Sequence, residues 1–128
     1  AMNEIARIII LSFFLILFGG CSTTITNLTP SQLPRADSGL YTLDAHWELP
    51  RKEILEDSIQ PYAVVEMEQY LMKRTPHVED RWETVIPIPP EKNYIDYYFK
   101  IDYNHHGFGV IKHNSVASDP YSLKISDL

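Results

Sequence analysis

Imidazole and carboxylate side chains gather in one short stretch near the carboxyl end of the chain. The stretch runs Asp102-Tyr103-Asn104-His105-His106-Gly107, with His113, Asn114 and Asp119 close behind. Imidazole nitrogens and carboxylate oxygens are ligands of zinc and copper, so a metal site here would use His105, His106 and His113. However, adjacent residues of a strand point to opposite faces, and the sequence has no His-x-His or HExxH spacing. We therefore expect a solvated polar loop between two strands, without a bound metal.

Catalysis by a nucleophile needs a base held beside a hydroxyl or thiol. Three serines follow His113 within nine residues, but no Gly-x-Ser-x-Gly elbow positions any of them. The acidic residues of 53–57 are typical of a charged surface turn, and the five scattered glycines form no phosphate-binding loop. These observations predict a protein that is not an enzyme. The hydroxyl and carboxylate groups considered are those of Ser115, Ser118, Ser122, Glu53, Glu56 and Asp57.

The only cysteine, Cys21, stands directly behind an apolar segment at the beginning of the chain. Residues 8–18 are apolar except for Ser12, and two glycines separate them from the cysteine. An apolar core of about 7–15 residues followed by small residues characterises a secretory signal. The run is short for a transmembrane helix, which needs about 20 apolar residues. A single cysteine also excludes an intramolecular disulfide.

The sequence Phe18-Gly19-Gly20-Cys21 resembles the lipobox of bacterial lipoproteins, although Phe18 stands where Leu is usual. The resemblance implies that a signal peptidase recognises residues 18–20 and cuts before Cys21. It also implies that the thiol carries diacylglycerol and that the new amino group is acylated. Two or three acyl chains, at about 0.8 kcal/mol per buried methylene, would anchor the protein stably. Ser22, by resemblance to enterobacterial sorting, implies the outer membrane. We expect no cofactor other than this covalent lipid.

The chain beyond residue 20 has the size of one domain, about 100 residues. Its formal net charge of −6 and its lack of a basic cluster predict that it does not bind nucleic acid. Residues 1–20 are the expected signal peptide, and residues 21–39, rich in Ser, Thr and Pro, are the expected lipidated tether. Leu28 and Leu33 could pack back on the domain, which we expect to occupy residues 40–128.

Apolar and polar residues alternate with a period of two in several segments of this domain, which indicates half-buried strands. We expect strands at 41–49, 62–67, 70–74, 81–88, 94–103 and 121–126, with a turn at Glu68-Gln69. Residues 54–60 fit a helix, turn or strand, and the antiparallel context favours a strand around 57–59. Together these segments predict an all-β fold, an immunoglobulin-like antiparallel β-sandwich of about 6–8 strands. Trp47, Trp82 and Phe99 are the expected centre of its core.

Two further resemblances involve longer stretches of the chain. Thr26-Asn27-Leu28-Thr29-Pro30-Ser31-Gln32-Leu33-Pro34-Arg35, with Ser38-Gly39-Leu40-Tyr41 and Arg81-Trp82-Glu83-Thr84, looks like a group of small bacterial lipoproteins without established function. Residues 82–102, with Val85-Ile86-Pro87 and Tyr98-Phe99-Lys100-Ile101-Asp102, are similar to immunoglobulin-like modules attached to carbohydrate-active enzymes. The first implies an exported, lipid-anchored domain. The second implies a sandwich strand pair and transfers no binding residue.

Tyr94 and Tyr98 fall on the polar face of the strongest expected strand. Exposed tyrosine rings can anchor a protein interface or stack on sugars, although neighbouring strands or loops could equally cover them. The leading hypothesis is a lipid-anchored interaction or assembly module that binds another envelope protein. The alternative is a carbohydrate-binding module that uses these two rings. The sequence identifies no small-molecule ligand.

Overall fold

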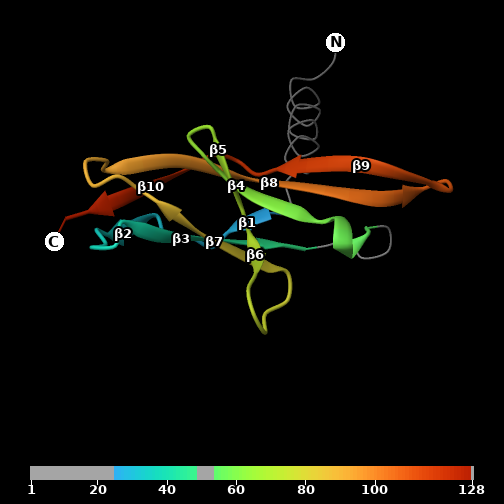
Figure 1. Cartoon of the computed structure of the whole chain (residues 1–128), viewed down its shortest axis with the longest axis horizontal. Helices are drawn as coiled ribbons and strands as arrows, with labels where there is room; N and C mark the ends of the chain where they lie inside the picture. The colour runs from blue at the N-terminus through green and yellow to red at the C-terminus, as the bar shows by residue number, and fades with distance from the viewer. Residues whose placement is uncertain (1–24, 49–53, 128) are drawn as a thin grey trace, which may run out of the picture.

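The computed structural model describes residues 25–48 and 54–127. The expected signal peptide and Cys21 lie outside them, so the lipobox is a prediction that the fold does not address. The described chain forms two β-sheets stacked face to face (Figure 1). Within these residues, no helix is long and apolar enough to cross a membrane.

The first sheet has four strands in the order β1-β3-β7-β6. Its long central pair is antiparallel, and its register joins His46 to Arg81 and Leu40 to Pro87. The predicted alternation holds in the first member of this pair, where Tyr41, Leu43, Ala45 and Trp47 are all buried. The strands are β1 (Ile25–Asn27), β3 (Leu40–Trp47), β6 (Lys73–Arg74) and β7 (Arg81–Pro87).

The second sheet has the order β2-β10-β8-β4-β5, and a sixth strand, β9, pairs with the second half of β8. All its pairs are antiparallel except β2 with β10, which is parallel. The strands are β2 (Gln32–Pro34), β4 (Gln60–Val65), β5 (Glu68–Leu71), β8 (Tyr94–Gly107), β9 (Val110–Ala117) and β10 (Tyr121–Ser126).

This strand order confirms the predicted immunoglobulin-like sandwich. The order β1-β3-β7-β6 corresponds to strands A, B, E and D of that fold, and β10-β8-β4-β5 corresponds to G, F, C and C′. The described part contains ten strands rather than about 6–8. The difference comes from short edge strands and from β9, none of which carries a strong alternating pattern.

The core lies between the two sheets and is dominated by aromatic and aliphatic side chains. Phe99 is completely buried, and its ring centroid lies 5.6 Å from that of Tyr97 and 6.2 Å from that of Tyr121. The side-chain amide of Asn27 on β1 donates a hydrogen bond of 2.8 Å to the hydroxyl of Tyr97 on β8. This bond links the two sheets and satisfies a polar group that burial would otherwise penalise.

The segment expected to be a tether belongs, from Ile25 onward, to the sandwich. β1 pairs with β3, β2 pairs with β10, and Leu33 packs against the core. The hydroxyl of Thr29 accepts a hydrogen bond of 2.9 Å from the backbone amide of Asp44. Strand pairing with the sheet edges therefore overrides the loop-like composition of residues 25–39, because it satisfies the backbone groups of this stretch.

Two details between β3 and β5 also differ from expectation. Residues 56–58 form a 3-10 helix, η1 (Glu56–Ser58), rather than part of a strand around 57–59. The β4–β5 hairpin is present as predicted, but its turn is at Glu66-Met67 and not at Glu68-Gln69. Both turn residues have positive φ, 52° and 118°. The turn was not predicted at this place because it contains neither Gly nor Asn, the residues that usually mark such turns.

The largest difference is at residues 104–119, which were expected to be a polar loop. β8 continues to Gly107 and forms a hairpin with β9, with Gly107 paired to Val110. Nearly all of β9 is exposed, so no buried face imposes an apolar alternation on its sequence. That is why the pattern of residues 110–117 did not predict a strand.

Candidate functional site

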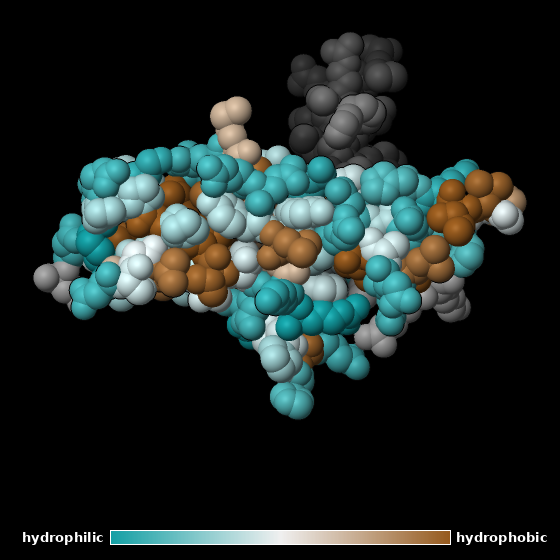
Figure 2. Space-filling view, viewed as in Figure 1, coloured by the Kyte–Doolittle hydropathy of each residue, from teal (hydrophilic) through white to brown (hydrophobic). Residues whose placement is uncertain are grey.

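The hairpin of β8 and β9 projects past the rest of the sandwich, as Figure 1 shows. We call residues 103–114, which form this projection, the arm. A two-residue turn, Phe108-Gly109, closes it with φ values of 48° and 78°, as a type I′ turn requires. Phe108 is fully exposed, and Val110 and Ile111 are each 59% exposed. Figure 2 shows hydrophobic side chains gathered at this tip.

The base of the arm is fixed to the sandwich. Ile54 forms an isolated β-bridge with His105, and the amide of Leu55 donates to the carbonyl of Asn104 at 3.0 Å. The rings of Trp47 and Tyr103 are 5.4 Å apart, which attaches the first sheet to the start of the arm. The arm is therefore a braced ribbon that is free only toward its tip.

The three histidines of the expected loop lie on this arm and are spread over it. His105 and His106 are consecutive in β8 and point to opposite faces, as expected for a strand. Nδ1 of His113 lies 3.2 Å from Oδ1 of Asn104. Among the described residues, no three His, Cys, Asp or Glu side chains are grouped so as to hold a metal ion.

The hydroxyls considered for catalysis are engaged in structural hydrogen bonds. Ser115 donates to Asp102 at 2.7 Å, and Ser122 donates to Asp96 at 2.6 Å. The Ser118 hydroxyl accepts from the amide of Phe99 at 2.8 Å, so it extends the pairing between β8 and the chain that follows β9. Glu56 and Asp57 are exposed in η1, and Glu53 lies outside the described residues.

Tyr94 and Tyr98 lie on the outer face of β8, and among the described residues both rings remain at least partly exposed. Their exposed fractions are 64% and 36%, and Asp96 stands between them. A groove of about 370 Å³ runs beside Tyr98. Apolar side chains make up much of its lining, namely Val64, Met67, Tyr98 and Pro120.

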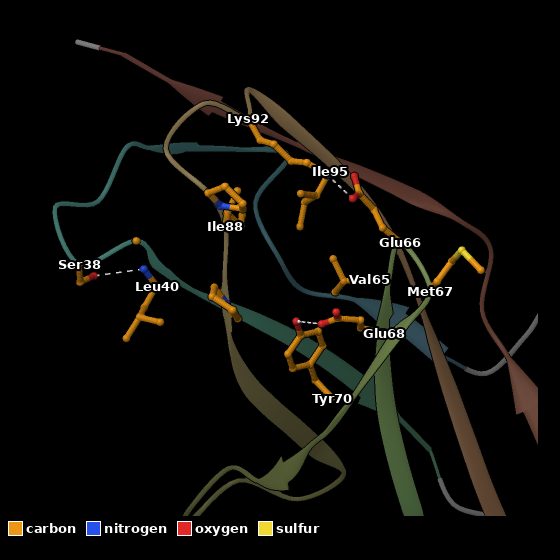
Figure 3. A pocket seen from close by; sticks show the side chains of 13 residues that line it. Ser38, Leu40, Val65, Glu66, Met67, Glu68, Tyr70, Ile88, Lys92 and Ile95 are labelled. Atoms are coloured by element: carbon orange, nitrogen blue, oxygen red, sulfur yellow. Dashed lines mark hydrogen bonds and ion pairs between the residues drawn. The ribbon is translucent and has the colours of Figure 1, made fainter.

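A second hollow, of about 640 Å³, opens at the end of the sandwich between the two sheets (Figure 3). The buried side chains of Val65, Ile88 and Ile95 contribute its apolar part. Polar pairs stand on two sides in Figure 3: Lys92 with Glu66, and Tyr70 with Glu68. The Tyr70 hydroxyl donates to Glu68 at 2.7 Å, and this hydrogen bond raises the pKa of Tyr70.

The Glu66-Met67 turn separates the two hollows and lines both of them. We call this turn, the groove beside Tyr98 and the end hollow the distal surface. It lies away from the arm, because Val65 pairs with Tyr97 near the start of β8, whereas Gln60 pairs with Asp102 just before the arm. Met67 is 97% exposed here. Sequence reasoning missed Met67, since it assigned the residue to a buried strand.

Comparisons of the chain with protein-family models, curated proteins and solved structures found no match. The lipobox and both family resemblances therefore stay predictions.

Proposed function

We propose that the chain is a lipid-anchored, non-enzymatic module of the bacterial envelope that binds another envelope protein through its distal surface. The observation that carries this proposal is the nearly complete exposure of Met67 between two hollows with apolar linings. Concave apolar surfaces with a few polar groups at the rim are typical of binding sites. Methionine and tyrosine are also enriched where proteins meet.

Charge at the distal surface indicates the kind of partner. Glu66, Glu68 and Asp96 lie there with one base, Lys92, so this surface is acidic, and the chain as a whole carries a formal net charge of −6. A partner with an apolar side chain for the groove and basic residues around it would match both features. Complementary charge of this kind increases specificity and the rate of encounter.

The anchor in this proposal is the lipid on Cys21, and the expected location is the outer membrane. Mass spectrometry of the N-terminal peptide from purified protein should show a diacylglyceryl cysteine at Cys21. The Cys21→Ser protein should fold normally but lose processing and membrane retention. Processed Cys21→Ser protein that still fractionates with membranes would refute the anchor.

The docking part is tested by affinity isolation from detergent-solubilised envelopes. The full lipidated protein should co-purify a partner that Met67→Glu and Tyr98→Ala each reduce at least about tenfold, as loss of a central contact does. Val85→Ala is the matched control, because Val85 is 53% exposed on the opposite sheet. If no protein co-purifies above background, or if all three variants behave alike, this surface is not the docking site.

A glycan ligand is the second candidate, and the pair Tyr94 and Tyr98 favours it. Both rings are exposed on one strand face, with the Asp96–Ser122 hydrogen bond between them. Tyr94 does not line the groove, so Tyr94→Ala should abolish retention on polysaccharide while leaving protein docking unchanged. Failure of the wild-type protein to bind any polysaccharide on a broad glycan array would eliminate this candidate.

A further inference from the structure

We infer that the tip of the arm inserts into the same membrane that holds the lipid on Cys21. Phe108 is fully exposed at the tip, and Val110 and Ile111 stand beside it, each more than half exposed. Three large apolar side chains at the end of a projecting ribbon are therefore mostly exposed to water. Transfer of such groups from water to the acyl boundary of a bilayer is favourable.

The arm carries a charge that suits an anionic surface. Residues 103–118 contain no Asp or Glu, and Lys112 adds a positive charge near the tip. Since the whole chain has a formal net charge of −6 and this segment has +1, the rest of the chain carries −7. A negative surface potential repels acidic parts of a protein and tolerates this segment, so the arm can approach lipid headgroups without a penalty.

The first described residue, Ile25, lies near the base of the arm, so a lipid on Cys21 would hold the membrane close to the arm. Ile25 pairs with Trp47, whose ring contacts Tyr103 at the base of the arm. Only three residues stand between Cys21 and Ile25, so the Cα atoms of these two residues are at most about 14 Å apart when the chain is fully extended. From Tyr103 to Phe108 the arm reaches about 17 Å. A lipid on Cys21, as the proposed function requires, thus holds the bilayer within reach of the tip.

The arm also has the stiffness that insertion needs. Its strands stay paired up to Gly107 and Val110, and Ile54 and Leu55 brace its base. Little conformational entropy is lost when a ribbon that is already ordered enters the interface. With both lipid and tip in the bilayer, the distal surface would face away from the membrane, toward a partner.

Depth-dependent fluorescence quenching tests the inference on the full lipidated protein. The protein is reconstituted in vesicles of phosphatidylethanolamine and phosphatidylglycerol, with and without brominated acyl chains. Phe108→Trp places a fluorophore at the tip, and Met67→Trp is the matched control in the other two-residue turn. The native Trp47 and Trp82 are buried and give a constant background. We expect brominated lipid to quench the added signal of Phe108→Trp at least about twofold and to leave Met67→Trp unchanged, because only acyl-chain contact quenches.

The outcomes distinguish failure of tip insertion from failure of lipid anchoring at Cys21. Protein that floats with the vesicles but shows no quenching in Phe108→Trp, or equal quenching in both variants, overturns insertion and leaves the anchor standing. Protein that does not float refutes the anchor and the inference with it. Ile111→Trp repeats the measurement on β9 in case tryptophan disturbs the turn. Tip fluorescence that responds to an added envelope protein and not to brominated lipid would assign the arm to that protein instead.

Discussion

The two halves of β8 belong to one continuous strand, yet they differ in burial. From Tyr94 to Ile101 the odd-numbered residues are buried against the first sheet, and Phe99 has no exposed surface. Beyond Tyr103 the strand continues without a second sheet opposite it, and Phe108 at its end is fully exposed. The comparison teaches that burial in this protein depends on a facing layer and not on residue type.

The two tight turns sharpen the same contrast. Glu66-Met67 is attached to the rest of the sandwich. The Glu66 amide donates to the carbonyl of Asp96 at 3.2 Å, and the Glu66 carboxylate pairs with Lys92. Phe108-Gly109 also has two positive φ values but stands at the free end of the arm. Glu66-Met67 therefore forms part of the distal surface of the sandwich, whereas Phe108-Gly109 holds the Phe108 side chain away from the sandwich.

The largest difference is expected between the two phenylalanines. Phe99→Ala should lower the free energy of unfolding by about 3–5 kcal/mol, because it removes a completely buried ring. Phe108→Ala should change it by less than about 0.5 kcal/mol. Urea unfolding followed by tryptophan fluorescence measures both. A loss at Phe108 comparable to that at Phe99 would show that the arm is packed and that the contrast is wrong.

Two tyrosine hydroxyls, one in each half of β8, give the next effect. Tyr97→Phe leaves the Asn27 amide without its acceptor between the sheets, so we expect a loss of about 1–2 kcal/mol. Tyr103→Phe removes only an exposed bond of 2.9 Å from Asn114 and should cost less than about 0.5 kcal/mol. Thermal unfolding of both variants compares them. Equal losses would mean that the hydrogen bond between Asn27 and Tyr97 stabilises the fold no more than the exposed one does.

A glycine at each turn tests the comparison of the turns. Met67 has φ of 118°, outside the usual left-handed region, so Met67→Gly should relieve strain and stabilise the fold by about 1 kcal/mol after the entropic cost of glycine. Phe108 has φ of 48°, within that region, where a side chain costs about 1–2 kcal/mol. The entropic cost of glycine, about 0.5–1 kcal/mol, offsets most of the relief, so Phe108→Gly should gain less than Met67→Gly. A gain of 1 kcal/mol corresponds to about 4–8 °C in melting temperature. Destabilisation by Met67→Gly would mean that its side chain packs on the sandwich.

The smallest expected effect is on the stability of the fold at low pH, and it should come from the sandwich and not from the arm. The guanidinium of Arg35 donates to Asp127 at 2.5 Å, and this hydrogen bond lowers the pKa of Asp127. Because the pKa is lower in the folded state, the pair stabilises the fold above the ordinary aspartate pKa of about 3.9. That contribution disappears as the pH falls through the lower folded value. Asp127→Asn should therefore flatten the stability profile slightly below pH 4, although exposure of the pair keeps the change small. An unchanged profile would show that the pair adds no stability.

The sequence by itself determined the all-β class and most of the central strands. The period-two patterns at β3, β7, β8 and β10 report one buried face each, and a buried face is a property that local sequence can record. The position of Tyr94 and Tyr98 on the polar face of β8 was also predictable, whereas the sequence left open whether other segments cover them.

Three features could be known only from the tertiary structure: the formation of the arm, the pairing of residues 25–39 with the two sheets, and the shape of the distal surface. β9 is exposed on both faces, and β1 and β2 are three-residue edge strands, so pairing with distant strands defines them without a hydrophobic pattern. The exposure of Met67 depends on a turn whose positive φ values no glycine signals. These features arise from long-range backbone hydrogen bonds, which any side-chain sequence can make and which local patterns therefore do not record.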